Sequence, residues 1–234
     1  MGEASLARRI AAEGLGAFFL FACVIGSGIM AEVLSGGNDG LALLANMIAT
    51  GAILFVLITA LGPISGAHFN PAVTLVGALR RELTWRDAGA YVAAQLAFGI
   101  VGAWAAHLMF DLPIVQFSVK VRTGVGQWVG EFVATFGLLL TILGTARYRP
   151  RAVAGSVALY IAAAYWFTSS TSFANPAITV ARSLSDTFAG IAPHDVPGFV
   201  AAQIAGAMSA FAVAGFLFAG PATASAISPA PAEK

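Results

Sequence analysis

The sequence contains the tripeptide Asn-Pro-Ala twice, as Asn70-Pro71-Ala72 and as Asn175-Pro176-Ala177. Proline suits the first turn of a helix because its missing N–H would have no intrahelical partner there, and asparagine is a good N-cap. Each tripeptide therefore predicts a helix start, which carries roughly half a positive charge. The two asparagine amides can donate hydrogen bonds to one oxygen of a solute. A single copy is typical of an ordinary helix start, whereas two copies at equivalent places indicate a shared function.

The rest of the chain has the composition of a membrane protein. Of its 234 residues, 59% are hydrophobic and 10% are charged, which is too apolar for a soluble globular domain. A membrane-spanning helix needs about 20 mostly apolar residues. Six such runs occur at residues 10–34, 41–61, 88–110, 125–146, 152–167 and 196–219. Two further apolar segments, 67–79 and 173–184, are too short to cross. We therefore predict an all-α polytopic protein with six transmembrane helices and two re-entrant half-helices.

The two halves of the chain repeat each other. Besides the tripeptides, the matching residues are Glu13 and Phe18 with Glu131 and Phe136, and Val92-Ala93-Ala94-Gln95 with Val200-Ala201-Ala202-Gln203. Each repeat contains three spans, so the second copy enters the membrane from the opposite face. Irregular backbone at membrane depth is tolerated only when it is buried or lines a watery cavity. Two half-helices that meet at the midplane therefore indicate a pore or a central binding site.

These patterns predict a single domain over residues 1–234. The first repeat covers about residues 8–110, the second about 125–219, and residues 220–234 form a flexible tail. If both termini lie on one side, that side holds nine basic residues: Arg8, Arg9, Arg80, Arg81, Arg86, Arg147, Arg149, Arg151 and Lys234. The other side holds three, Lys120, Arg122 and Arg182. The excess of basic residues places both termini in the cytoplasm.

Several function classes are excluded by the same composition. The net charge is +1 and the basic residues are scattered, so a nucleic-acid partner is not expected. The spans hold no cluster of His, Cys and carboxylate side chains with metal-ligand or triad spacing, so we expect no metal, no cofactor and no enzymatic activity. The single Cys23 is interpreted as a packing residue.

The segment from Ser65 to Thr74, Ser-Gly-Ala-His-Phe-Asn-Pro-Ala-Val-Thr, resembles the first signature of the aquaporin, or major intrinsic protein, family. The resemblance covers essentially the whole chain. It implies a homotetramer in the lipid bilayer with one pore in each subunit. Glu13 and Glu131 are similar to the membrane-embedded glutamates that hold the re-entrant loops, although a proton-coupling role is the alternative for such acids. His68 is interpreted as a loop-packing residue, with a pH gate as its alternative.

The resemblance also assigns a filter on the extracellular side, and this chain departs from the family there. Where water-selective members have an arginine after the second tripeptide, this chain has Ile178. By the family's spacing, the other filter positions are Thr50, Ala163 and Ser172. All four side chains are uncharged and none is aromatic, which predicts a wider opening. Glycerol channels keep the arginine and follow it with aspartate, whereas Ile178 is followed by threonine. The arginine-free filter resembles that of bacterial members associated with arsenic resistance.

Other residues near this filter allow two interpretations each. Arg182 lies four residues after Ile178, on the same helical face and about 6 Å further out. It can line the outer vestibule, or it can form a salt bridge with a residue such as Asp186. Tyr165, Trp166 and Phe167 form either an interfacial belt or part of the pore wall.

Taken together, these residues predict a passive channel in the cell membrane. Its substrates are water and small uncharged solutes, including glycerol-like polyols or neutral metalloids such as arsenicals. The alternative is a coupled secondary transporter, because inverted repeats and broken helices also build transporters. That alternative requires Glu13 or Glu131 to be exposed to substrate.

Overall fold

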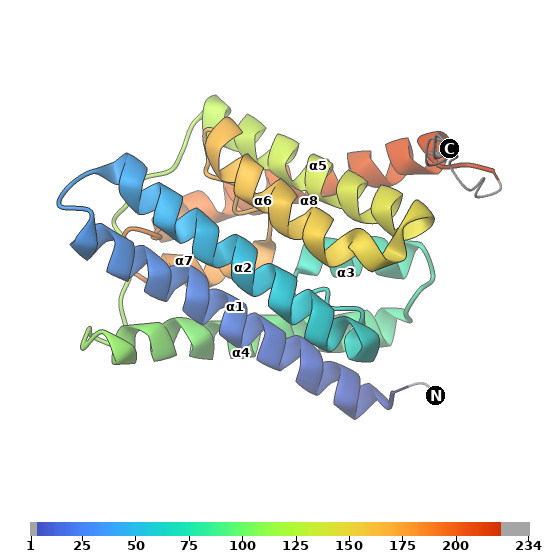
Figure 1. The fold of residues 1–234 in the computed structure, drawn as a ribbon, viewed down its shortest axis with the longest axis horizontal. Helices are drawn as coiled ribbons and strands as arrows, with labels where there is room; N and C mark the ends of the chain where they lie inside the picture. Colours follow the sequence, from blue (N-terminus) through green and yellow to red (C-terminus); the bar gives the residue numbers. More distant parts are fainter. Residues whose placement is uncertain (1–3, 221–234) are drawn as a thin grey trace, which may run out of the picture.

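A computed structural model describes residues 4–220 of the chain (Figure 1). Within this range all regular structure is helical. The α-helices are α1 (Leu6–Leu34), α2 (Asp39–Ser65), α3 (Pro71–Leu79), α4 (Trp85–Met109), α5 (Val125–Tyr148), α6 (Val153–Phe167), α7 (Pro176–Ser183) and α8 (Val196–Leu217), with 3-10 turns η1 (Pro150–Ala152) and η2 (Pro193–Asp195). The all-α prediction and the two half-helices, α3 and α7, are confirmed. The predicted tail beyond residue 220 lies outside the described residues.

The long helices form two groups, one from each repeat (Figure 1). Helix α1 packs against α2 and α4, and α5 packs against α6 and α8, while α2 and α6 join the two groups. The short helices α3 and α7 lie between the groups and contact each other. The first and last described residues lie at the same end of the molecule, which we call the terminal end. The opposite end, with loops 35–38, 110–124 and 184–192, is called the far end.

Five helical segments are long and apolar enough to cross a membrane. They correspond to α1, α2, α4, α5 and residues 193–217. The sixth predicted span is α6, which has only 15 residues and so rises about 22 Å. The 3-10 turn η1 precedes it directly and extends it toward the terminal end.

Close helix packing within each group depends on glycine. A Cβ at Gly102 of α4 would overlap the backbone carbonyl of Phe18 in α1, and a Cβ at Gly206 of α8 would overlap that of Phe132 in α5. The two contacts join the first and third long helices of each repeat. Any larger residue at these positions forces the paired helices apart.

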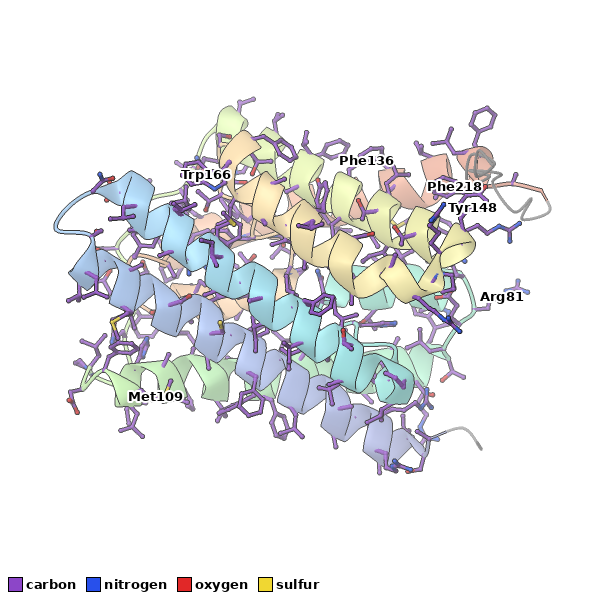
Figure 2. The ribbon with its side chains drawn as sticks, in the orientation of Figure 1. Arg81, Met109, Phe136, Tyr148, Trp166 and Phe218 are labelled. Carbon is purple, nitrogen blue, oxygen red and sulfur yellow. The ribbon has the colours of Figure 1, made fainter. Side chains whose placement is uncertain are left out.

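The outside of the bundle is apolar. Figure 2 shows side chains such as Met109, Phe136 and Trp166 projecting away from it. Met109 is 66% exposed and Trp166 is 50% exposed. A contiguous apolar surface of this kind fits contact with lipid or with other subunits rather than with water.

Candidate functional site

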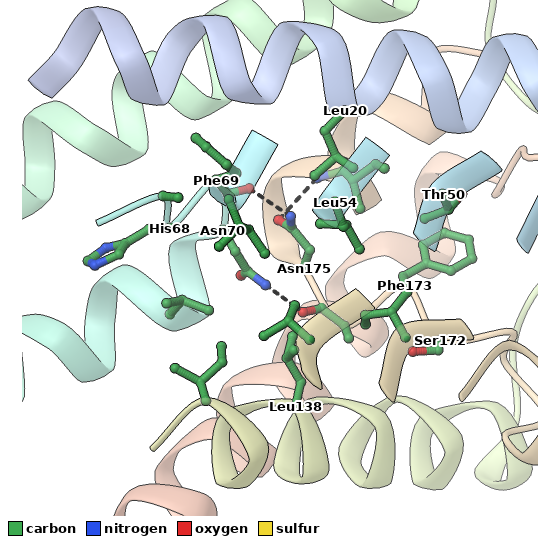
Figure 3. Close-up of a pocket in the computed structure, with 18 of the residues that line it drawn as sticks. Leu20, Thr50, Leu54, His68, Phe69, Asn70, Leu138, Ser172, Phe173 and Asn175 are labelled. Atoms are coloured by element: carbon green, nitrogen blue, oxygen red, sulfur yellow. Dashed lines mark hydrogen bonds between the residues drawn. The ribbon is translucent and has the colours of Figure 1, made fainter. Parts of the chain in front are cut away.

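The two asparagines of the tripeptides lie face to face at the centre of the molecule (Figure 3). Each caps its own half-helix: Asn70 Oδ1 accepts from the Ala72 amide at 2.9 Å, and Asn175 Oδ1 accepts from the Ala177 amide at 3.0 Å. Each Nδ2 group donates to the other repeat, from Asn70 to the Ala174 carbonyl and from Asn175 to the Phe69 carbonyl, both at 2.8 Å. An amide NH₂ carries two protons. One N–H of each asparagine therefore remains for a solute.

Two buried glutamates hold the loops that lead into α3 and α7. Glu13 accepts from the amides of His68 and Phe69 at 2.9 and 2.7 Å. Glu131 accepts from the amides of Phe173 and Ala174 at 2.8 and 2.9 Å. Both side chains are fully buried. The symmetry of these bonds agrees with the loop-supporting role that the resemblance implies.

The repeated glutamines complete each brace. Gln95 Nε2 joins Glu13 at 2.8 Å and Thr74 at 3.0 Å, and Gln203 Nε2 joins Glu131 at 2.6 Å and Thr179 at 2.9 Å. Both glutamines belong to the repeated Val-Ala-Ala-Gln segments, for which the sequence alone indicates no role. The structure assigns them to a link between the acid and the half-helix.

The same loops contain non-glycine residues with left-handed backbone. Ala67 and Phe69 precede the first tripeptide with φ of 52° and 49°, and Ser172 and Ala174 precede the second with φ of 51° and 48°. This conformation costs free energy for residues with a Cβ. The hydrogen bonds to Glu13 and Glu131 offset that cost and keep the loops against the cavity.

A cavity of about 100 Å³ runs past both asparagines. Its polar side is the backbone of the two loops. Its other side consists of helical rows four residues apart, Thr50, Leu54 and Ile58 on α2 and Val153, Val157, Ile161 and Tyr165 on α6, with contributions from α1, α3, α5 and α7. This side is apolar except for the hydroxyls of Thr50 and Tyr165 at its far end. One wall therefore offers hydrogen bonds and the opposite wall repels ions by lacking them.

The filter toward the far end differs from the sequence prediction at one position. Thr50, Ser172 and Ile178 all line the cavity. Ala163 is exposed on the outer face of α6 and does not line it, so the prediction for Ala163 is wrong. Tyr165 takes its place, and its hydroxyl lies 3.1 Å from the Thr50 hydroxyl. The region predicted to form the filter therefore includes an aromatic ring, Tyr165, where the small Ala163 was expected.

Of the three aromatic residues at the end of α6, only Tyr165 is a wall residue. Trp166 and Phe167 are half exposed on the outside, as an interfacial belt would be. The signal for Tyr165 was present in the sequence, because Val153, Val157, Ile161 and Tyr165 repeat at the spacing of one helical face.

Arg182 is buried in the wall of the cavity and is 3% exposed. Its Nε donates to the Ala189 carbonyl, and its guanidinium carbon lies 3.3 Å from the centre of the Phe173 ring. Among the described residues it forms no salt bridge. Asp186, the partner considered from sequence, instead accepts a hydrogen bond from the Val119 amide at 3.0 Å. The structure therefore favours the vestibule interpretation of Arg182.

His68 lines the cavity on the terminal side of Asn70. Its Nδ1 lies 3.1 Å from the Thr74 hydroxyl, and its ring packs edge-on against Tyr91 with centroids 5.5 Å apart. These contacts fit a packing residue whose edge reaches the cavity. Within residues 4–220 no group of three His, Cys, Asp or Glu side chains is placed to hold a metal ion.

Comparisons with known proteins agree with this geometry. A family model described as "Major intrinsic protein" matches residues 1–172. Aquaglyceroporin AqpS of Rhizobium meliloti (strain 1021) is 60% identical over 213 residues, which cover 91% of each chain. Aquaporin NIP1-1 of Oryza sativa subsp. japonica is 37% identical over 142 residues, 59% of this chain and 49% of that protein. The X-ray structure of the aquaglyceroporin from Plasmodium falciparum matches with a TM-score of 0.70 at 20% identity, covering 92% of this chain and 98% of that one, and so shares the fold.

Proposed function

Because the chain belongs to the major intrinsic protein family, we propose that it is a passive membrane channel for water and small uncharged solutes such as glycerol. The observation that carries this proposal is the pair of crossed asparagines, each with one amide N–H free at the centre of a narrow cavity. A water that accepts from both amides has its lone pairs occupied. It cannot accept a proton from its neighbour, so water passes while a proton wire is interrupted.

Glycerol is proposed as a solute because of the filter and the relatives. The lining of the cavity includes the hydroxyl-bearing residues Thr50, Tyr165 and Ser172 together with the apolar Ile178. A polyol has hydroxyls on one edge and C–H groups on the other, so this lining matches it. Two of the similar proteins carry the name aquaglyceroporin.

We extend the proposal to neutral metalloid hydroxides, which arsenicals form in water. Such molecules resemble glycerol in carrying several hydroxyl groups without charge. Position 178 is isoleucine instead of the arginine found in water-selective members. This difference supports the extension, because a fixed guanidinium at that position would narrow the filter. Tyr165 limits the opening, so the proposal covers compact trihydroxy species rather than larger ones.

The geometry argues against a coupled transporter. Glu13 and Glu131 are fully buried, accept several hydrogen bonds each and do not line the cavity. An acid that couples transport must exchange protons with the solute path. We therefore propose conduction without a coupling ion, a covalent step or a cofactor.

We also propose that the terminal end faces the cytoplasm and that four copies assemble. The first proposal is supported by the excess of arginine at that end, and the second by the resemblance to the family. Protease accessibility of a tag at each end in inner-membrane vesicles tests the first, and the mass of the detergent-solubilised particle tests the second.

The function is tested with purified protein in sealed liposomes. Stopped-flow light scattering after a sucrose challenge measures water flow, and re-swelling after a glycerol challenge measures glycerol entry. A trapped pH-sensitive dye reports proton entry. We expect fast shrinkage and glycerol re-swelling without acidification. Rates equal to those of empty liposomes, from folded protein, would remove the channel proposal.

A further inference from the structure

The wall of the cavity at its far end holds a buried cationic group, Arg182. Arg182 is almost completely buried, lines the cavity and forms no salt bridge within residues 4–220. Burying an unpaired charge costs several kcal/mol unless nearby dipoles or an opposite charge compensate it. The groups around Arg182 therefore decide what the cavity can bind.

Its known partners are dipoles. The Ala189 carbonyl accepts from Nε, the Phe173 ring lies beneath the guanidinium, and Arg182 is in the last turn of α7, at the negative end of the helix dipole. Glu131 is the buried acid of this repeat, but its oxygens already accept from the amides of Phe173 and Ala174 and from Gln203. The two terminal nitrogens of Arg182, Nη1 and Nη2, therefore keep N–H groups that can donate hydrogen bonds to a ligand.

Further positive charge lies around the same ring. The guanidinium of Arg122 lies 5.1 Å from the centre of Phe173, and its nitrogens donate to the carbonyls of Gly190 and Ser170. In the loop outside the membrane, the pKa of Lys120 is lowered by burial and by the nearby charges of Arg122 and Arg182. Of the carboxylates at this end, Asp195 accepts from the Arg122 amide, Asp186 from the Val119 amide and Glu32 from the Phe188 amide.

A second polar group points to a ligand independently of the charge. Ser172 is 3% exposed, lines the same cavity, and its Oγ has no hydrogen-bond partner. Ser172 and Arg182 line the same cavity, and Ser172 precedes Phe173, the residue on whose ring the guanidinium stacks. Buried hydroxyls are normally paired. An unpaired hydroxyl and a cation without a salt bridge in the wall of one cavity form a donor set that suits a negatively charged oxygen.

From Arg182 and Ser172 together we infer that the far end of the pore is a binding site for a small monovalent oxyanion or carboxylate. The planar fork of a guanidinium donates two parallel hydrogen bonds to such groups, and the Ser172 hydroxyl supplies a third. The inference rests on the proposed channel function, because the anion occupies the path that neutral solutes use. An anion bound there competes with glycerol.

Nitrate is a suitable probe, because it is planar, carries three oxygens and stays charged at every pH of interest. Glycerol re-swelling of protein-containing liposomes is followed while nitrate replaces chloride at constant ionic strength. We expect saturable inhibition with a half-inhibiting concentration on the order of millimolar, typical of a single desolvated ion pair. Arg182→Gln is expected to raise that concentration about tenfold, which corresponds to about 1.4 kcal/mol. Arg182→Lys, which keeps the charge but loses the fork, should lie between the two.

Two further variants separate the site from its surroundings. Ser172→Ala removes one donor and nothing else, and should weaken inhibition severalfold, so it decides the matter if Arg182→Gln does not fold. Lys120→Gln removes a cation whose ammonium donates to the Phe188 carbonyl and does not line the cavity, and should change inhibition no more than about twofold.

The outcomes distinguish this inference from the channel proposal. Absent glycerol flux in chloride would overturn the channel itself. Normal glycerol flux that is indifferent to nitrate would overturn only the anion site. Inhibition that is equal in the wild type and in Arg182→Gln, or equal in the wild type and in Ser172→Ala when Arg182→Gln is unfolded, would also overturn it. Nitrate titration calorimetry on the detergent-solubilised protein provides a readout independent of flux.

Discussion

The Tyr165 hydroxyl lies 3.1 Å from the Thr50 hydroxyl, which links α6 to α2 beside the cavity. The two groups belong to different repeats and are 115 residues apart. Their contact fixes the edge of the aromatic ring relative to the solute path. We therefore propose that the size limit of the cavity at this level depends on this pair rather than on Ala163.

Tyr165→Ala should enlarge the filter. Removing the ring opens space between α6 and α2 beside the cavity, so we expect the entry of a four-carbon polyol to rise severalfold relative to that of glycerol. Stopped-flow re-swelling with the two polyols measures the ratio. Ala163→Val is the matched control, because it changes an outward-facing residue two positions away, and its ratio should equal that of the wild type. The reverse pattern would restore the original assignment of Ala163.

Tyr165→Phe tests the hydrogen bond alone. The ring stays, and the loss of one buried hydrogen bond is expected to lower the free energy of unfolding by about 1 kcal/mol. Thermal unfolding in detergent measures this change. Polyol selectivity should shift far less than in Tyr165→Ala, since the bulk is retained. A selectivity change as large as that of Tyr165→Ala would show that the hydroxyl, and not the ring, sets the limit.

Ile178→Arg introduces an arginine at the position where water-selective members of the family have one. The added side chain narrows the filter and faces Arg182 one turn away, where like charges repel. We expect glycerol flux to fall about tenfold while water flow persists, as measured by paired sucrose and glycerol challenges. Ile178→Met, which has a similar length without charge, is the control. Equal loss of both fluxes would point to misfolding or a blocked pore.

Glu131→Ala should unfold the second re-entrant loop. It leaves the amides of Phe173 and Ala174 without an acceptor, and breaking such a buried polar network costs roughly 3–5 kcal/mol. The expected result is a large drop in melting temperature and loss of flux. Glu32→Ala is the control, because this exposed acid accepts only one amide bond, from Phe188, and should melt within a few degrees of the wild type. A stable, conducting Glu131→Ala protein would contradict the scaffolding role.

Gly206→Ala should separate α8 from α5. The new methyl group meets the Phe132 carbonyl, and overpacking against backbone typically costs about 1–3 kcal/mol. Gly215→Ala on the same helix is the matched control, because nothing lies within 4 Å of its Cβ position. It should be neutral or stabilising by roughly 0.5–1 kcal/mol through helix propensity. Similar melting temperatures for the two variants would show that the helices accommodate the methyl group.

Much of this architecture followed from local patterns. Apolar run lengths located the six spans, and Asn-Pro located the starts of α3 and α7, because both signals depend only on neighbouring residues. The family resemblance assigned the repeated glutamates to the loops, and their equivalent places in the two halves favoured that role over proton coupling. These sequence signals do not depend on the lengths of the loops between the helices.

The filter residue on α6 could not be located by counting. Counting back twelve residues from Asn175 assumes a fixed loop between α6 and α7, and an error of two residues rotates a helical position by about 200°. Ala163 therefore faces outward while Tyr165 faces inward. The burial of Arg182 without a salt bridge was equally inaccessible, because it depends on the position of Phe173 and of the Ala189 carbonyl in a separate loop.

The crossed bonds of Asn70 and Asn175 also affect how the protein is made. The partners are 104 and 106 residues apart, so a ribosome needs roughly 5–20 s to deliver the second after the first. During that interval the first re-entrant loop has no acceptor for Asn70 and no donor for the Phe69 carbonyl. The first half of the chain therefore remains incompletely folded in the membrane until the second half has been synthesised and these hydrogen bonds can form.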